Sequence, residues 1–326
     1  MKQKLRMIIG RLKSPCSNIG LLHGKTGIAV FLYQYAKYYD SSYGDFAGQL
    51  IDEVFESLQT ELTFDYEAGL AGTGAGIEFL VQQGYVSGDT NEILQNFDKY
   101  IHRFLSKYSI PVDTKNGITG FGKYYLARLK SQSNMNVTDS LSFCFKERLI
   151  RIVDSLSAPY SSYIDLYSVI DFLPDLIALD INREKACLFL NYAVDRIETM
   201  AHEDVYFGKY QGAFNPLVTA VLLFCAAHKS GNNEFTGRAF YFLETFERKY
   251  RRYLSNDFAV KWAFLYRKIW KPSGFSVYKE LSDEWLEKVA DGLSNLEWGD
   301  LILAGMMLLS LNEPDNDDYL NLFPLY

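Results

Sequence analysis

Glycine clusters that each open an apolar segment recur along this chain, and they constrain its fold more than any other feature. The three strongest clusters are Gly20, Gly24 and Gly27, then Gly69, Gly72, Gly74 and Gly76, then Gly117, Gly120 and Gly122. Their first glycines lie 49 and 48 residues apart. A repeat of roughly 20 to 50 residues is the mark of an architecture built from stacked units.

Weaker copies continue the series at about the same step. Residues 165–173 have lost the glycines, residues 208–217 keep two, residues 256–265 keep none, and residues 299–309 keep two. Together with the three strong copies, they predict seven repeat units.

Amphipathic helices are predicted between the glycine-rich ones. Apolar residues in segments 47–62, 93–105 and 186–197 recur at the three- and four-residue steps of a helix with one buried face. The alternating runs that indicate β-strands are short. We therefore predict an all-α protein made of helix pairs, organised as one domain over residues 1–326.

Helix pairs of this kind close most simply into an α/α toroid, with the apolar helices inside and the amphipathic helices outside. Both ends of the series stay apolar, so we expect a closed ring rather than an open solenoid. Glycine at an inner-helix start permits close backbone approach, and it also leaves backbone N–H groups free to face a ligand. The glycine turns would then cluster at one end of a central bowl.

Two classes of ligand are disfavoured by motif and charge. Residues 72–76 are not a nucleotide-binding loop, because no apolar strand precedes them and no Gly-Lys-Ser/Thr follows. The 33 basic and 40 acidic residues give a net charge of −7, which argues against a nucleic-acid or anionic-membrane surface.

The remaining composition suits a globular protein. Apolar residues make up 48% of the 326 residues, and no run of 18 apolar residues predicts a membrane span. Four cysteines, Cys16, Cys144, Cys187 and Cys225, show neither a disulfide framework nor a zinc spacing. We expect a cytoplasmic protein.

The glycine segments resemble the helix starts of the lanthionine synthetase C-like (LanC-like) family, which follow the pattern Gly-Leu-x-x-Gly-x-x-Gly. The resemblance is best over residues 18–130. It implies an α/α toroid with seven inner and seven outer helices. It also implies peptide modification, in which a central zinc activates a peptide Cys thiolate for addition to a dehydrated Ser or Thr.

The chain departs from the family at the zinc ligands, which are one Cys in a Trp-Cys-Tyr-Gly-Asp type segment and a Cys-His pair in a following repeat. By repeat phase, Leu254 stands where the first Cys is expected, and Asp257 matches the aspartate. Glu297 and Trp298 stand where the Cys-His pair is expected, and a shift of a few residues brings no cysteine into either segment. We therefore expect no zinc, no other cofactor and no zinc-dependent cyclase activity.

Eight residues are candidates for lining the bowl, although the sequence assigns a catalytic role to none of them. They are His23, Tyr66, Glu67, Asp165, Tyr210, Asp257, Glu297 and Trp298. The two aspartates also suit helix capping, and Trp298 also suits the core.

Three functions remain open from the sequence. The favoured one is a pseudoenzyme that binds a peptide or protein partner in the bowl. The second is an active enzyme, either a cyclase with an unusual site or a glycoside hydrolase with two carboxylates about 5 to 9.5 Å apart. Its carboxylate candidates are Glu67, Asp165, Asp257 and Glu297. The third is an interaction module whose bowl is filled by aromatic side chains of the inner helices, such as Phe31, Phe79, Phe121, Tyr124, Phe172 and Phe214.

Overall fold

The computed structural model describes residues 2–14, 16–57, 63–131, 140–156, 159–160, 162–207, 215–251, 255–293, 296–311 and 318–325. Within these ranges the regular elements are α-helices and short 3-10 helices, and no strand is present, so the all-α prediction is confirmed. No helix in the described ranges combines the length and the apolar character that crossing a membrane requires.

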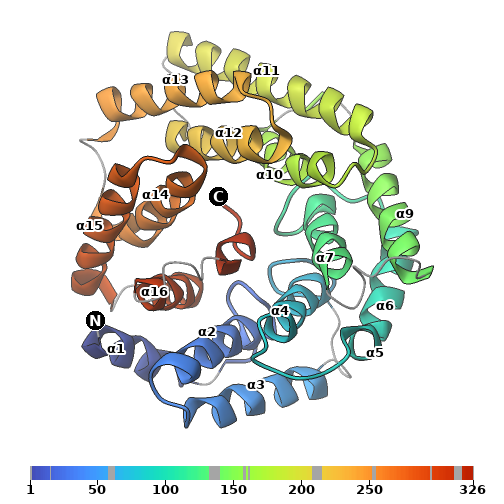
Figure 1. Cartoon of the computed structure of the whole chain (residues 1–326), viewed down its shortest axis with the longest axis vertical. Helices are drawn as coiled ribbons and strands as arrows, with labels where there is room; N and C mark the ends of the chain where they lie inside the picture. The colour runs from blue at the N-terminus through green and yellow to red at the C-terminus, as the bar shows by residue number, and fades with distance from the viewer. Residues whose placement is uncertain are drawn as a thin grey trace.

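The helices form two concentric rings (Figure 1). In the described part of the chain the inner ring contains α2 (Lys25–Tyr38), α4 (Leu70–Gln82), α7 (Ile118–Lys130), α10 (Tyr163–Ala178), α12 (Pro216–Ser230), α14 (Ala259–Ser273) and α16 (Trp298–Ser310). The outer ring contains α1 (Lys2–Leu12), α3 (Tyr43–Ser57), α5 (Thr90–Ile93), α6 (Gln95–Leu105), α9 (Ser140–Ser155), α11 (Arg183–Phe207), α13 (Glu234–Lys249) and α15 (Ser276–Gly292).

The inner ring is closed. Each inner helix contacts the next along the chain, and the last one, α16, contacts the first, α2. The predicted α/α toroid is therefore confirmed, and the open solenoid is wrong. Six of the seven predicted inner segments coincide with an inner helix or with its start. Most of the remaining one, residues 208–214, lies outside the described residues, and residues 215–217 lead into α12.

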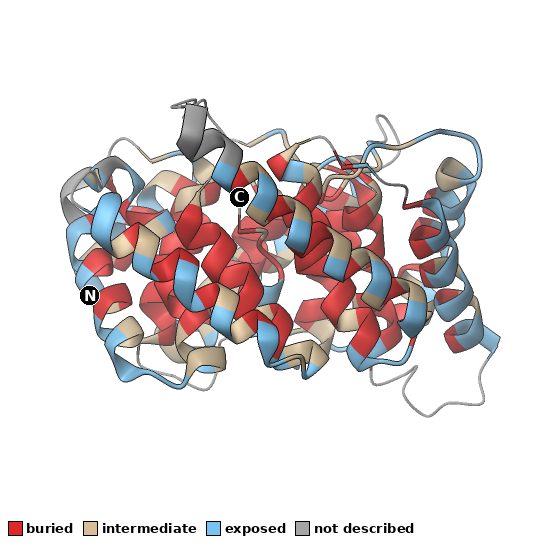
Figure 2. Cartoon of the chain, turned by 90° about the horizontal axis from the view of Figure 1, so that it is seen from above, coloured by how far each residue is buried: buried red, intermediate tan, exposed pale blue. Residues whose placement is uncertain are grey.

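Burial separates the two rings. Every residue of α4 from Leu70 to Leu80 is buried, whereas α3 buries only Ala47, Leu50 and Val54. Figure 2 shows the buried residues concentrated in the middle layer and the exposed ones on the outer helices. A helix that is apolar all round must be covered on every side, and the second ring supplies the outer cover.

The glycines at the inner-helix starts permit close backbone contact. Gly27, Gly72 and Gly120 are each the third residue of their helix, and each packs against the loop that leads into it. A Cβ at these positions would lie 2.0, 1.9 and 2.1 Å from a carbonyl oxygen of that loop. The first predicted role of the glycines is therefore confirmed, because no larger residue fits this approach.

Carbonyl groups of the same loops accept hydrogen bonds from the backbone N–H groups at the helix starts. The N–H of Lys25 donates to the Asn18 carbonyl at 2.8 Å, and the N–H of Leu70 donates to the Thr63 carbonyl at 3.0 Å. The first N–H of α7 is bonded in the same way at 2.9 Å. The second predicted role, N–H groups left free for a ligand, is therefore wrong at these helices, because the loop carbonyls already accept from them.

A second set of glycines receives aromatic rings from neighbouring inner helices. The pairs are Gly74 with Tyr124, Gly122 with Phe172, and Gly305 with Phe31. A Cβ at these glycines would come within 2.5, 2.4 and 2.6 Å of the ring. These rings therefore fill the space between inner helices rather than the bowl, and the third pair lies at the seam between α16 and α2.

Residues 318–325, which begin with the short helix η4 (Asp318–Asn321), lie in the centre of the ring (Figure 1). We call them the central tail. The buried Tyr66 side chain donates from its hydroxyl to the Leu322 carbonyl at 3.1 Å. Tyr319, Phe323 and Leu325 are buried as well. The chain itself therefore occupies the middle of the bowl.

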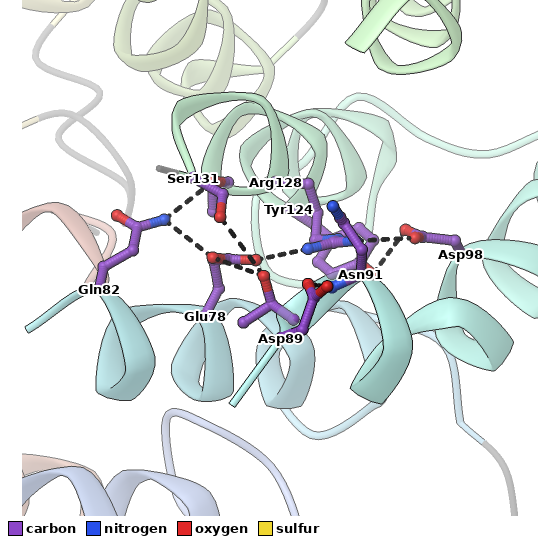
Figure 3. Close-up of polar contacts among 10 residues, drawn as sticks. Glu78, Gln82, Asp89, Asn91, Asp98, Tyr124, Arg128 and Ser131 are labelled. Carbon is purple, nitrogen blue, oxygen red and sulfur yellow. Dashed lines mark hydrogen bonds and ion pairs between the residues drawn. The ribbon is translucent and has the colours of Figure 1, made fainter. Parts of the chain in front are cut away.

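A buried ion-pair network fastens α7 to α4 and α6 (Figure 3). The guanidinium of Arg128 lies 2.6 Å from a Glu78 carboxylate oxygen and 3.2 Å from an Asp98 oxygen. The Tyr124 hydroxyl donates to the other Asp98 oxygen at 2.8 Å. Burial and the nearby Asp98 carboxylate hold the pKa of Tyr124 well above its usual value. Because these groups are buried, each charge is stabilised mainly by its oppositely charged partner.

Replacing Gly72 by alanine tests the backbone contact at an inner-helix start. We expect Gly72→Ala to lower the free energy of unfolding by at least about 2 kcal/mol, because the loop carbonyl must move. The matched control is Gly237→Ala in α13, where nothing lies within 4 Å of the added methyl. That substitution should raise stability by about 0.5–1 kcal/mol. Urea unfolding measures both, and equal effects would contradict the account.

The Arg128 network gives a second stability prediction. Arg128→Met keeps much of the side-chain volume but leaves the Glu78 carboxylate buried without its partner, so we expect a loss of about 3–5 kcal/mol in urea unfolding. The control is Arg151→Met, which removes an exposed pair with Glu147 and should change stability little. A loss no larger than that of the control would show that Glu78 is hydrated or paired differently.

Candidate functional site

Three loops of the strong repeats lie side by side at one end of the inner ring. The N–H of Leu22 donates to the Glu67 carbonyl at 3.1 Å, and the N–H of Tyr66 donates to the Lys115 carbonyl at 2.9 Å. These bonds run between neighbouring repeats. They place the side chains of His23, Glu67 and Lys115 along one end of the ring.

A pocket of about 300 Å³ lies at this end, and we call it the loop-end pocket. Its polar lining residues are His23, Glu67, Lys115, Lys261, Glu297 and Asp300. Phe264, Leu303 and Phe323 supply apolar wall. The structure thus brings together three of the eight predicted residues, His23, Glu67 and Glu297. The volume lies at the lower end of the range for sites that hold a small molecule or a few side chains.

The imidazole of His23 is held by a carboxylate and a glycine. Its Nε2 atom lies 3.2 Å from a Glu67 carboxylate oxygen. A Cβ at Gly299 would lie 2.4 Å from the Nδ1 atom, so Gly299 leaves the space that the ring occupies. This arrangement orients an imidazole and a carboxylate as one hydrogen-bonding pair at the edge of the pocket.

The pocket holds carboxyl groups in different environments. Burial raises the pKa of Asp300, the nearby Glu297 raises it further, and Lys261 acts in the opposite direction. Glu297 itself is exposed. Carboxyl groups whose surroundings differ in this way can serve as proton donor and acceptor, or as hydrogen-bond donor and acceptor for a ligand.

Three predicted residues lie outside this pocket. Tyr66 points to the central tail, where it donates to Leu322, and burial raises its pKa. Asp165 forms a capping box with Ser162 at the start of α10, so it caps a helix. It lines neither this pocket nor a second cavity of about 400 Å³, which borders Tyr66 and is described below. Trp298 is the first residue of α16 and packs, partly buried, against the core.

The side chains of the last two predicted residues lie outside what the structure describes. Tyr210 lies outside the described residues, and Asp257 lies in the 3-10 helix η2 (Asn256–Phe258), where its side chain is not described. Leu254, which stands at the position of a zinc-binding cysteine, is also outside the described residues.

The donor set does not fit the zinc that the resemblance implies. A catalytic zinc needs three protein ligands, with thiolates among them in this family's pattern. None of the four cysteines, all of which lie in the described ranges, lines the loop-end pocket. Across the described ranges, no three His, Cys, Asp or Glu side chains lie close enough together to hold a metal ion.

Three residues of the pocket were missed by the sequence analysis. Lys115 stands three residues before α7, as Glu67 stands three residues before α4. Its position within the repeat was therefore the sequence signal that could have identified it. Lys261 and Asp300 are the third residues of their helices, the position that glycine occupies in the strong repeats. Because those later repeats are degenerate, their helix starts were too loosely placed to reveal it.

The comparison with solved structures agrees with this architecture. Nisin cyclase is a solved structure that matches with a TM-score of 0.69, over 99% of this chain and 96% of that chain. The fold is that of a LanC-like α/α toroid. The two sequences are 14% identical, so the likeness concerns the fold. No family model matches this chain, and no curated protein does.

The raised pKa of Asp300 predicts a pH-dependent stability. The folded protein disfavours the ionised carboxylate, so stability falls as the pH rises from the ordinary value of 3.8 through the raised one. Asp300→Asn removes this loss. We expect the variant to be more stable than the wild type at pH 7, with the difference vanishing below pH 3.8 in urea unfolding.

The control for this titration is Asp154→Asn. A hydrogen bond from Lys185 lowers the pKa of Asp154, so its ionised form supports the fold above the ordinary pKa. This variant should therefore be less stable than the wild type at pH 7. Destabilisation by Asp300→Asn at pH 7 would contradict the assigned environment of Asp300.

Proposed function

We propose that this LanC-like toroid binds a peptide or protein partner at the loop-end pocket, without zinc-dependent cyclase activity, as an accessory in peptide modification. The observation that carries the proposal is the central tail. It is a chain segment lodged inside the ring, and the Tyr66 hydroxyl bonds to its main-chain carbonyl at Leu322. A ring interior that holds one segment in this way is suited to hold the segment of a partner.

The loop-end pocket has the mixed lining that peptide recognition uses. Phe264 and Leu303 offer apolar contact, while the paired His23 imidazole and Glu67 carboxylate offer polar atoms in a fixed geometry. Such sites combine apolar walls with a few oriented polar groups. The name of the structural neighbour, nisin cyclase, also favours a peptide as the ligand.

The donor set argues against cyclase chemistry. Thioether formation in the family relies on a zinc-bound thiolate, and the described residues of the pocket supply neither the thiolate ligands nor a cluster of three donors. Cys16 lies close by, with its Sγ atom 3.9 Å from the His23 carbonyl oxygen. Burial raises the pKa of this thiol, which makes it a poor nucleophile at neutral pH.

Carboxylate-based hydrolysis of a glycoside is the second candidate. Asp300, with its raised pKa, is suited to protonate a leaving group, and Glu67 or Glu297 would be the second carboxyl group. Both kinds of carboxyl group are needed for that chemistry. The central tail favours the peptide proposal over this one.

Selection of peptides on the full-length chain tests the proposal. A random-peptide display library is panned on the wild type, and the enriched peptides are synthesised and titrated by fluorescence anisotropy. We expect micromolar binding that His23→Ala and Glu67→Gln each weaken at least about tenfold, or 1.4 kcal/mol. The control is Lys185→Ala, which alters an ion pair with Asp154 on the outer ring and should bind as the wild type does.

Two outcomes would contradict the peptide proposal. One is a library that yields no peptide. The other is binding that the two pocket substitutions leave unchanged. Turnover of chromogenic glycosides that Asp300→Asn abolishes would support the second candidate instead.

A further inference from the structure

A second cavity, of about 400 Å³, lies where the later halves of several inner helices meet the central tail. Four lysines and two aspartates dominate its lining, and we call it the lysine cavity. Six of its eight charged lining residues are these lysines and aspartates: Lys123 and Lys130 of α7, Asp171 and Asp175 of α10, Lys229 of α12 and Lys268 of α14. The central tail contributes residues to both cavities and lies between them. None of these six residues takes part in the loop-end pocket.

Three of the lysines are paired with the two aspartates. Lys123 lies 2.6 Å from Asp171, while Lys130 and Lys229 lie 2.8 and 2.7 Å from Asp175. Burial alone would raise the pKa of Asp175, but the two lysines hold it well below its ordinary value. One carboxylate therefore serves two ammonium groups, and the positive charge is in excess on this side of the cavity.

The fourth lysine, Lys268, forms no ion pair with the described residues. Among the described residues, no carboxylate oxygen lies within 4.0 Å of its ammonium group. Burial lowers its pKa to about 8, and Lys123 and Lys229 add to that effect against the opposing charge of Asp171. An ammonium group with this neighbourhood is stabilised by any anion that reaches it.

The other carboxylates of the lining do not supply that anion. Glu78 is bound to the buried guanidinium of Arg128 at 2.6 Å. Asp318 is exposed and accepts a hydrogen bond from Gln83 at 3.1 Å. Both therefore have other partners.

Part of the cavity wall is apolar. Phe79 of α4, Leu126 of α7 and Leu322 of the central tail contribute to its lining. A volume of about 400 Å³ is within the range of small-molecule sites, and the combination of apolar wall and oriented charge is typical of them.

We propose that the lysine cavity binds a small organic anion, with its carboxylate or phosphate group on Lys268 and its apolar body against Phe79 and Leu126. The anion supplies the negative partner that Lys268 lacks, and it also accepts hydrogen bonds from Lys229 and Lys123. Charge-assisted hydrogen bonds of this kind are stronger in a protein interior than in water. The proposal is independent of peptide binding at the loop-end pocket.

Calorimetric titration of the full-length chain at neutral pH tests it with three probes of one chain length. Hexanoate carries the carboxylate, hexyl phosphate carries the phosphate, and 1-hexanol carries neither. We expect saturable binding of at least one anion with a Kd below about 1 mM, and none of the alcohol. Binding of hexanoate alone identifies a carboxylic acid as the ligand class, and binding of hexyl phosphate alone identifies a phosphate ester.

Lys268→Met locates the bound anion. The folded protein disfavours the charge of Lys268, so the variant should keep its fold, which circular dichroism and the unfolding midpoint verify. Binding of the anion should weaken at least about tenfold, while the control Lys185→Met on the outer ring leaves it unchanged. Three results would overturn the proposal: unchanged affinity in the folded Lys268→Met variant, equal binding of 1-hexanol, or no binding of either anion at millimolar concentration.

Discussion

The contact between each entering loop and the start of its inner helix is the constraint on which the rest of the structure depends. At Gly72 the helix backbone and the loop carbonyl are so close that a Cβ would overlap the oxygen, at 1.9 Å. The closeness lets the loop carbonyls bond the first N–H groups of the helix, so no side-chain cap is needed. It also lets neighbouring loops bond to one another, and this places His23 beside Glu67. The loop-end pocket is thus a direct product of the glycine repeat.

Closure of the ring has a second consequence, which is an interior shared by distant parts of the chain. Gly305 and Phe31 meet at the seam between α16 and α2, and the central tail then passes through the middle. Two cavities of different character result. One combines an imidazole, carboxyl groups and lysines at the helix starts, and the other collects lysines along the later halves of the helices. Each takes its chemistry from side chains that several repeats contribute.

The strong repeats made much of this predictable from sequence. The three glycine clusters located α2, α4 and α7, and their shared phase identified His23 and Glu67. The degenerate repeats predicted less, because a helix start known only to a few residues does not say which side chain faces inward. For this reason Asp165 was expected to line the bowl, although it caps α10, and Lys261 and Asp300 were not expected in the pocket. The central tail had no local signal, since its bond to Tyr66 joins residues 256 positions apart.

We infer that the loop-end pocket binds its ligand through the side chains present there and without a bound metal. The most direct test is the zinc content of the full-length protein, purified without chelators and measured by elemental analysis before and after incubation with zinc. We expect far less than one zinc per chain in both samples. One tightly held zinc per chain would contradict this inference, because it would require a ligand set that the described residues do not provide.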